Sequence, residues 1–146
     1  MQRERRVEIM PNTNNIVLFN QAPLRELIEK HAFELAKELG EGNETTKSQL
    51  RRFYQEYNDI RNKIRYGDEN AYEKNEVALK MLIAKAQYAG GRQGSKLPKM
   101  FIDWLVKNIK AIKSKEDVEV FGNYFEAFLG YFYGVRGERD RGANRR

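Results

Sequence analysis

The chain has 146 residues, a length typical of a single domain that can bury its own core. It has no cysteine and one histidine, His31, which excludes disulfide bonds, cysteine-ligated metals and the histidine cages of most zinc and iron enzymes. The net charge of +6 points instead to an anionic partner, and we expect no catalytic residue, metal or cofactor.

The first 22 residues are expected to form a polar N-terminal extension. Residues 1–10 are charged and lack the apolar core of a signal peptide, and only residues 16–19 are apolar. Nowhere does the chain approach the roughly 18 consecutive apolar residues that cross a bilayer. We therefore expect a cytoplasmic protein with no membrane contact.

After this extension, apolar residues recur at helical spacing in five segments, and no segment alternates as a strand does. The pattern predicts an all-α fold, a single bundle of about five helices over residues 23–133. The first helix is expected to begin at Pro23 and to end near Leu39, with Gly40 just past its end. Phe33 lies on the charged side of this helix, where it could contact a partner. The apolar face is expected to contain Leu24, Ile28, His31 and Leu35.

The second helix is expected to begin at Thr46, because a Thr cap followed three residues later by Gln49 can form a capping box, and to end at Gly67. Its core stripe contains Leu50, Phe53, Tyr57, Ile60 and Ile64. Arginine and amide side chains that can contact phosphate and sugar lie on the opposite side, namely Arg51, Arg52, Gln55, Asn58 and Asn62, flanked by Arg61 and Arg65. The alternative is an ordinary solvated face, since Glu56 and Asp59 partly neutralise it.

The third helix, over about residues 69–89, is apolar on two sides. One face contains Tyr72, Leu79, Leu82, Ile83 and Ala86, and the nearly opposite face contains Val77, Met81, Ala84 and Tyr88. Such a helix is typical of the centre of a bundle. After it, Gly90 and Gly91 free the backbone from Cβ clashes, which presents Arg92 on a turn.

The fourth helix is expected to begin at a Ser95 cap and to run to about Ile112. Its inward residues are Phe101, Trp104, Leu105, Ile109 and Ile112. The free N–H groups and the dipole at its N-terminus favour an anion near Arg92, Lys96 and Lys99. The alternative is a flexible connector between two helices.

The fifth helix has a cap signal in Ser114 and Asp117. Its inward stripe contains Val118, Phe121, Phe125, Phe128, Leu129 and Phe132. Tyr124 and Tyr131 make this stripe wider than one neighbouring helix covers, so we expect self-association through Val120, Tyr124 and Tyr131. Residues 134–146 contain five arginines and little apolar surface, which predicts a mobile, disordered basic tail.

Three segments stand out when they are taken together: residues 46–54 (TKSQLRRFY), 85–92 (KAQYAGGR) and 121–131 (FGNYFEAFLGY). In their order and spacing they resemble the small subunit of Csm-type (type III-A) CRISPR RNA-guided effector complexes. The resemblance implies a helical, non-catalytic subunit of an antiviral ribonucleoprotein, repeated along the guide RNA and target RNA beside other Csm-type subunits. It also implies that basic residues contact the RNA backbone. We assign this role to Arg51, Arg52 and Arg92, with a supporting field of Arg61, Arg65, Lys85, Lys96 and Lys99.

Two other functions stay open at this point. One is a helical assembly adaptor that binds protein through its fifth helix and has no affinity for RNA. The other is a metal-independent ribonuclease that uses Tyr, Lys, Arg and Glu side chains for acid-base chemistry. A titration with RNA separates the three, because the adaptor does not bind RNA and the enzyme turns it over.

Overall fold

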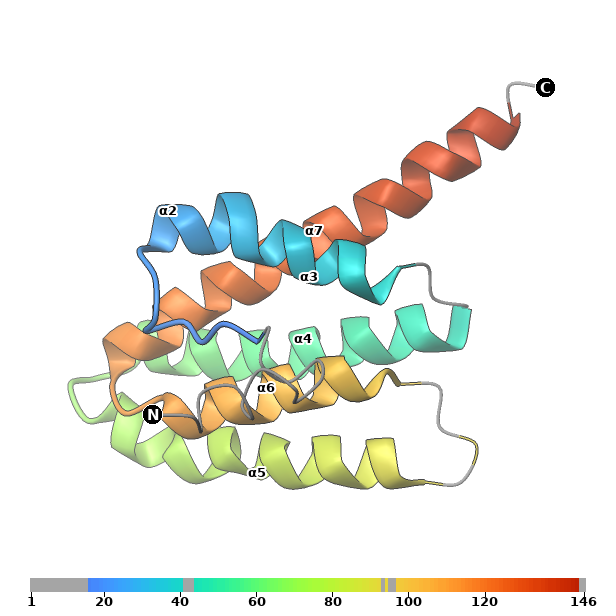
Figure 1. Cartoon of the computed structure of the whole chain (residues 1–146). Coiled ribbons are helices and arrows are strands. Elements are labelled where there is room, and N and C mark those ends of the chain that lie inside the picture. The colour runs from blue at the N-terminus through green and yellow to red at the C-terminus, as the bar shows by residue number, and fades with distance from the viewer. Residues whose placement is uncertain (1–15, 41–43, 93, 95–96, 145–146) are drawn as a thin grey trace, which may run out of the picture.

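Figure 1 shows the computed structural model of the chain, which describes residues 16–40, 44–92, 94 and 97–144; the side chains of Glu44 and of residues 135–144 lie outside this description. In chain order the elements are α2 (Leu24–Glu26), the π-helical η2 (Leu27–His31), α3 (Ala32–Leu39), α4 (Glu44–Arg65), α5 (Ala71–Gly91), α6 (Lys99–Ala111) and α7 (Lys115–Asn144). All regular structure in these residues is helical, and α2, η2 and α3 follow one another without a break. The predicted all-α bundle of about five helices is therefore confirmed.

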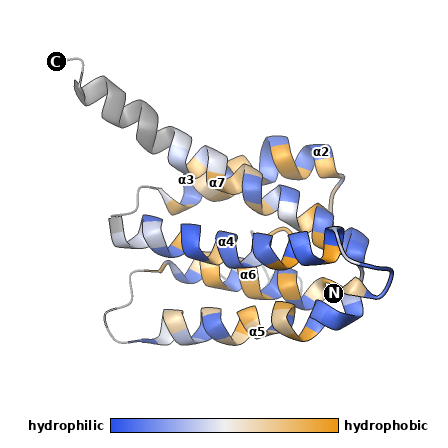
Figure 2. Ribbon diagram, turned by 180° about the vertical axis from the view of Figure 1, so that it is seen from behind, coloured by the Kyte–Doolittle hydropathy of each residue, from blue (hydrophilic) through white to orange (hydrophobic). Residues whose placement is uncertain are grey.

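The helices lie in layers, with α5 on one side of the molecule and α2–α3 on the other. α5 packs on α4 and α6, whereas α3 packs on α7, which crosses the bundle obliquely (Figure 1). Figure 2 shows the same order from behind. Leu79 and Leu82 of α5 are buried, but Val77 and Met81 on its other apolar face are exposed. The expectation that this helix is central is therefore wrong.

The first helix spans the predicted residues, but a different face of it is buried. The N–H of Ala32 bonds the carbonyl of Leu27, five residues earlier, and a π turn of this kind adds one residue to the helical repeat. The buried side chains are therefore Leu27, Ala32, Leu35 and Ala36, whereas Leu24 is exposed and Ile28 and His31 are only partly buried. Gly40 ends the helix with a φ of +67°, a conformation that favours glycine.

The start of α4 differs from its prediction. Because the helix is already formed at Glu44, Thr46 lies inside it and is buried, so Thr46 is not the cap. The buried Oε1 atom of Gln49 has no hydrogen-bond partner in the described part of the chain, so the expected capping box does not form. The core stripe from Leu50 to Ile64 is buried as predicted.

The predicted start is wrong for α6 and right for α7. α6 begins at Lys99 directly after Pro98, later than the predicted Ser95 cap, which lies outside the described residues. In α7 the predicted cap is confirmed, because the Ser114 hydroxyl accepts a hydrogen bond from the Asp117 N–H at 3.1 Å. The Asp117 carboxylate in turn accepts one from the Lys113 N–H at 2.9 Å.

The core is built around Trp104 of α6, whose ring meets aromatic side chains of α7. The Trp104 ring centroid lies 5.1 Å from that of Phe121 and 5.2 Å from that of Tyr124. Tyr124 is only 1% exposed, and its hydroxyl donates a 2.8 Å hydrogen bond to the carbonyl of Val17. The same chain therefore covers the Tyr124 side of the α7 stripe. This corrects the assignment of Tyr124 to a subunit interface.

The other two residues predicted at a subunit interface lie at the edge of the core. Val120 and Tyr131 are partly buried, and their role between subunits stays a prediction.

Part of the predicted polar extension packs on the bundle, since Phe19 is 4% exposed and its N–H donates a hydrogen bond of 2.7 Å to the Asn108 side chain. The α7 backbone is helical to Asn144, past the predicted end at Tyr133. None of the helices in the described residues combines the length and hydropathy of a membrane span.

Candidate nucleic-acid interface

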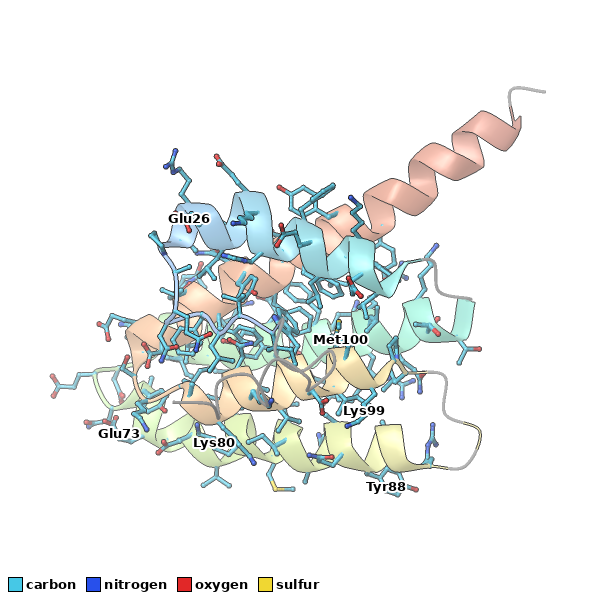
Figure 3. All side chains as sticks on the ribbon, in the orientation of Figure 1. Glu26, Glu73, Lys80, Tyr88, Lys99 and Met100 are labelled. Carbon is cyan, nitrogen blue, oxygen red and sulfur yellow. The ribbon has the colours of Figure 1, made fainter. Side chains whose placement is uncertain are left out.

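The start of α4, the end of α5 and the start of α6 lie at the same end of the bundle (Figure 1). α4 and α5 are consecutive packed helices joined by a short turn, so the first turns of α4 lie beside the last turns of α5. The ring of Phe53 in α4 lies 6.3 Å from that of Phe101 in α6. Figure 3 shows Tyr88, Lys99 and Met100 at this end. The basic positions of the two sequence motifs are thus brought to one end of the molecule.

Gly90 allows α5 and α6 to approach each other closely at this end. A Cβ atom at Gly90 would overlap the side chain of Ile102, whereas Gly91 has open space around it. Both glycines are still helical, and the left-handed conformation is taken by Gly94, with a φ of +80°. Arg92 follows the helix in an extended conformation. The exposed presentation of Arg92 is as expected, but the reason for Gly90 is interhelical packing.

The three arginines predicted as main contacts share one property. Arg51, Arg52 and Arg92 are exposed, and in the described part of the chain none of them has a carboxylate within ion-pair distance. Arg51 instead lies over the ring of Tyr133, with its guanidinium carbon 5.3 Å from the ring centroid. Arg92 lies over the exposed ring of Tyr88 at 5.8 Å. These contacts orient the guanidinium groups without neutralising them.

The residues predicted as a supporting field behave differently, because each described one has an acidic neighbour. Lys85 lies 3.2 Å from the Glu56 carboxylate, and Lys99 lies 3.3 Å from that of Asp103. Arg61 and Arg65 both face carboxylates of α7. Lys96 lies outside the described residues.

Arg61 is buried between α4 and α7, with 5% of its surface exposed. Its Nε donates to Asn58 at 3.0 Å, its Nη2 donates to the Tyr54 hydroxyl at 3.4 Å, and Nη2 lies 3.6 Å from Glu126. A Cβ atom at Gly122 would overlap the guanidinium, so this glycine makes the space for it. Burial, with the nearby Glu126 charge, raises the pKa of Tyr54. Arg61 therefore joins two helices, which corrects its assignment to an RNA-facing field.

Arg65 forms a two-pronged ion pair with Glu119 of α7. The Arg65 Nε and Nη2 atoms donate hydrogen bonds of 2.7 and 2.6 Å to the two carboxylate oxygens. These bonds lower the pKa of the Glu119 carboxyl against the opposing effect of partial burial. The pair ties the end of α4 to the start of α7.

A separate cavity of about 870 Å³ lies between η2 and α3 on one side and α6, α7 and residues 16–17 on the other. Its lining includes the apolar side chains Leu35, Met100, Trp104 and Tyr124 and the charged side chains Lys30, Lys37, Glu34 and Glu38. Two carboxylates beside two ammonium groups do not favour a polyanion. Within the described residues there is also no group of three or more His, Asp or Glu side chains that could hold a metal ion.

Comparison with known proteins adds to this geometry. The model of the Csm2 type III-A family matches residues 22–136, which is more than half of the chain. The chain belongs to the Csm2 type III-A family. This confirms the resemblance predicted from three segments and identifies a subunit of the type III-A CRISPR effector complex. Searches of curated proteins and of solved structures found no match.

The Csm2 family match includes the whole candidate interface. Residues 46–54, 85–92 and 121–131 all lie inside the matched region, and so do the three exposed arginines. Residues 1–21 and 137–146 lie outside it. The family match therefore does not extend to the basic tail after residue 136.

Proposed function

We propose that this Csm2-family chain is a non-catalytic RNA-binding subunit that contacts the guide RNA and target RNA backbone through Arg51, Arg52 and Arg92. One observation carries the proposal. These three arginines are exposed at one end of the bundle and lack carboxylate partners in the described residues, whereas Arg61, Arg65, Lys85 and Lys99 have them.

The chemistry of this end suits phosphate. A guanidinium can donate charge-assisted hydrogen bonds to a phosphate oxygen, and its fixed charge releases counterions from the RNA. The first turn of α6 contains no acidic residue, so its free N–H groups add a positive potential at the same end of the bundle as Arg92. Such contacts read the backbone and not the bases. We therefore expect weak, sequence-tolerant binding by the isolated subunit and tighter binding in the assembled complex.

The remaining parts of the proposal follow from the family. We propose an antiviral role in the cytoplasm, as one of several copies that associate with one another and with other Csm-type subunits along the RNA. Cleavage is expected to belong to other subunits. Accordingly, neither added metal ions nor chelators should alter RNA turnover by the purified chain, because none should occur. Turnover that disappears on a single substitution in this chain would support the ribonuclease alternative.

The decisive experiment compares two triple variants that lose the same charge. One replaces Arg51, Arg52 and Arg92 with Ala, and the control replaces the exposed Lys63, Lys107 and Lys110 with Ala. Loss of a guanidinium–phosphate hydrogen bond typically costs about 1.5 to 3 kcal/mol before screening, so each arginine change should weaken binding several-fold. The salt slope should fall by roughly 0.7 for each phosphate that the variant no longer neutralises. Fluorescence anisotropy with a labelled single-stranded RNA measures both.

The thermal midpoint of the arginine variant should stay close to that of the parent, because exposed charges contribute little to folding. Equal RNA affinity of the two triple variants would contradict the proposal. A parent chain with no RNA affinity would favour the adaptor. Removal of residues 134–146 should cause a smaller, purely electrostatic loss, and a larger loss than in the arginine variant would move the site to the C-terminus.

A further inference from the structure

Tyr88 near the end of α5 is an aromatic residue that the fold leaves uncovered. It is 71% exposed, and Figure 3 shows it on the outer side of α5, at the same end of the bundle as Lys99. Among the described residues its ring contacts only the Arg92 guanidinium, whose carbon lies 5.8 Å from the ring centroid, and its hydroxyl has no hydrogen-bond partner there. The ring therefore contributes little to the core and is available to an outside partner.

The side chains next to Tyr88 on the helix surface leave its ring open. Residues three and four positions away are neighbours on a helix, and here they are Ala84, Lys85, Gly91 and Arg92. Ala84 is small, and Gly91 has open space around it. Lys85 is held by a carboxylate of α4, 3.2 Å away. Arg92 thus covers one face of the ring, and the other face is open to solvent.

A second tyrosine of the same kind lies at the opposite end of the bundle. Tyr66 follows the last residue of α4 and is 77% exposed, and the Arg65 guanidinium carbon lies 5.8 Å from its ring centroid. Both oxygens of Glu119 bind that guanidinium, whereas Arg92 has no carboxylate partner in the described part of the chain. The two tyrosine–arginine pairs have the same separation, but only the pair at Tyr88 combines an open ring with an available charge.

We infer that the open face of Tyr88 stacks on an unpaired base of the RNA while Arg92, on the other face, binds a phosphate of the same strand. Unpaired bases stack on aromatic side chains, and every base has a suitable face, so the contact does not depend on sequence. A base inside a duplex has no free face to offer. The inference rests on the proposed function for the RNA contact itself, and it adds that this end of the bundle recognises a single-stranded nucleotide.

An outside protein is the competing partner for Tyr88, because Met81 on the same helix is also exposed. The charge beside the ring favours RNA. Arg51 and Arg52 are exposed at this end as well, and neither has a carboxylate within ion-pair distance among the described residues. A nucleotide brings a phosphate to such a charge together with its base. An apolar protein surface would instead bury the Arg92 charge without a partner, which is costly.

The test compares Tyr88→Ala with Tyr66→Ala in the full chain, on a short single-stranded RNA and on a blunt duplex of the same sequence. Loss of one base stack should weaken single-strand binding by about 5-fold or more. Affinity for the duplex should not change, and Tyr66→Ala should leave both affinities at the parent value. Since no charge is removed, Tyr88→Ala should keep the salt slope of the parent, whereas Arg92→Ala should lower it by roughly 0.7. Fluorescence anisotropy measures all four quantities.

A fluorescent base gives a direct readout of stacking. In a single-stranded RNA that contains 2-aminopurine, saturation with the parent chain should change the fluorescence of this base, because the base gains a stacking partner. Tyr88→Phe keeps the ring and should give the same change. Tyr88→Ala, also at saturation, should give a smaller one, and its thermal midpoint should stay close to that of the parent because the ring is exposed.

Three outcomes overturn the inference. Equal losses of affinity for the single strand and the duplex in Tyr88→Ala, with a lower salt slope, would mean that the ring only orients Arg92. Fluorescence of 2-aminopurine that the parent chain leaves unchanged would mean that no base is bound. Parent-like RNA binding by Tyr88→Ala, with weaker association to other subunits of the purified complex, would make the ring a protein contact.

The stack and the backbone contact fail in different ways. If the triple arginine variant loses RNA affinity and Tyr88→Ala binds like the parent, only the stack is wrong. If the triple arginine variant binds like the parent, the proposed backbone contact is wrong, whatever Tyr88→Ala does.

Discussion

The two halves of α4 use arginine in opposite ways. In the first half, Arg51 and Arg52 are exposed and no carboxylate pairs with them among the described residues. In the second half, Arg61 is buried against Glu126, and Arg65 is held by both oxygens of Glu119. All four lie off the apolar stripe of the same helix. Arg51 and Arg52 lie opposite that stripe and Arg61 and Arg65 beside it, but this position alone does not show which of them meets a carboxylate.

The neighbouring helix decides which role each arginine takes. Glu119 and Glu126 are seven residues apart on α7, so they lie on one face of that helix, two turns from each other. Gly122, between them, leaves the room that the Arg61 guanidinium fills. An arginine side chain is long enough to cross to such a neighbour, and it then contributes packing as well as charge. Arginines without such a neighbour are the ones available to an outside partner.

The largest effect is expected from closing the space at Gly122, which holds the buried Arg61 side chain. Gly122→Ala places a Cβ atom against the Arg61 guanidinium, and overpacking of this kind costs about 1 to 3 kcal/mol of the free energy of unfolding. The control is Gly130→Ala in the same helix, where nothing lies within 4 Å; it should stabilise the chain by up to about 1 kcal/mol through helix propensity. Urea denaturation measures both.

A second round of the same experiment tests the cause. In a chain that already carries Arg61→Ala, the additional cost of Gly122→Ala should largely disappear, because the clashing group is gone. An undiminished cost in that background would mean that Gly122 is needed for a reason other than Arg61.

Removal of one arginine of each kind should separate stability from RNA binding. Arg61→Ala removes a buried group and its hydrogen bonds to Asn58 and Tyr54, so it should lower the free energy of unfolding by about 1 to 3 kcal/mol and leave RNA affinity unchanged below the melting point. Arg52→Ala should do the reverse, with weaker RNA binding at unchanged stability. Anisotropy and urea titrations on both variants check this. The distinction fails if both variants lose RNA affinity equally.

Most of the helices could be predicted from the sequence, because helical periodicity and cap residues are local signals. The α7 cap at Ser114 and Asp117 and the buried stripe of α4 are confirmed in full. The π turn at Leu27 could not be predicted, since no proline or glycine marks it. The predicted buried face of the first helix is therefore right at Leu35 and wrong at Leu24, which is exposed.

The expectations for Tyr124 and for α5 are wrong for the same physical reason. A row of apolar residues shows that a face can be covered, but not by what. Tyr124 widens the α7 stripe because α6 and the segment at Val17 cover it within the chain. The second apolar face of α5 has no such cover in the described bundle. The two helices have the same kind of apolar pattern, and only the packing separates a core helix from an outer one.

Tyr133 offers a smaller test of the first half of α4. Its ring lies under Arg51 at 5.3 Å and under Lys47 at 5.4 Å, and its hydroxyl donates a 2.6 Å hydrogen bond to the Lys47 carbonyl. Tyr133→Leu removes the aromatic face, a contact worth about 0.5 to 1 kcal/mol at exposed sites. RNA affinity should fall less than in Arg51→Ala, because the charge remains. Tyr133→Phe keeps the ring and should keep the affinity, and a loss as large as that of Arg51→Ala would mean that Tyr133 contacts RNA itself.

The smallest expected effect concerns the Arg65–Glu119 pair and its response to pH. The folded state lowers the pKa of the Glu119 carboxyl below its ordinary value of 4.5. The pair therefore contributes stability above that value and loses it as the pH falls through the lowered pKa. Glu119→Gln should lower the melting temperature slightly at neutral pH, and the difference from the parent should shrink as the solution is made acidic.

Arg65→Lys keeps the charge but not the two-pronged geometry, so it should show part of the same loss in melting temperature, with RNA affinity unchanged. Differential scanning calorimetry across this pH range, with Glu116→Gln as the exposed control, measures the trend. A difference that persists unchanged in acid would mean that Glu119 acts through packing and not through its charge.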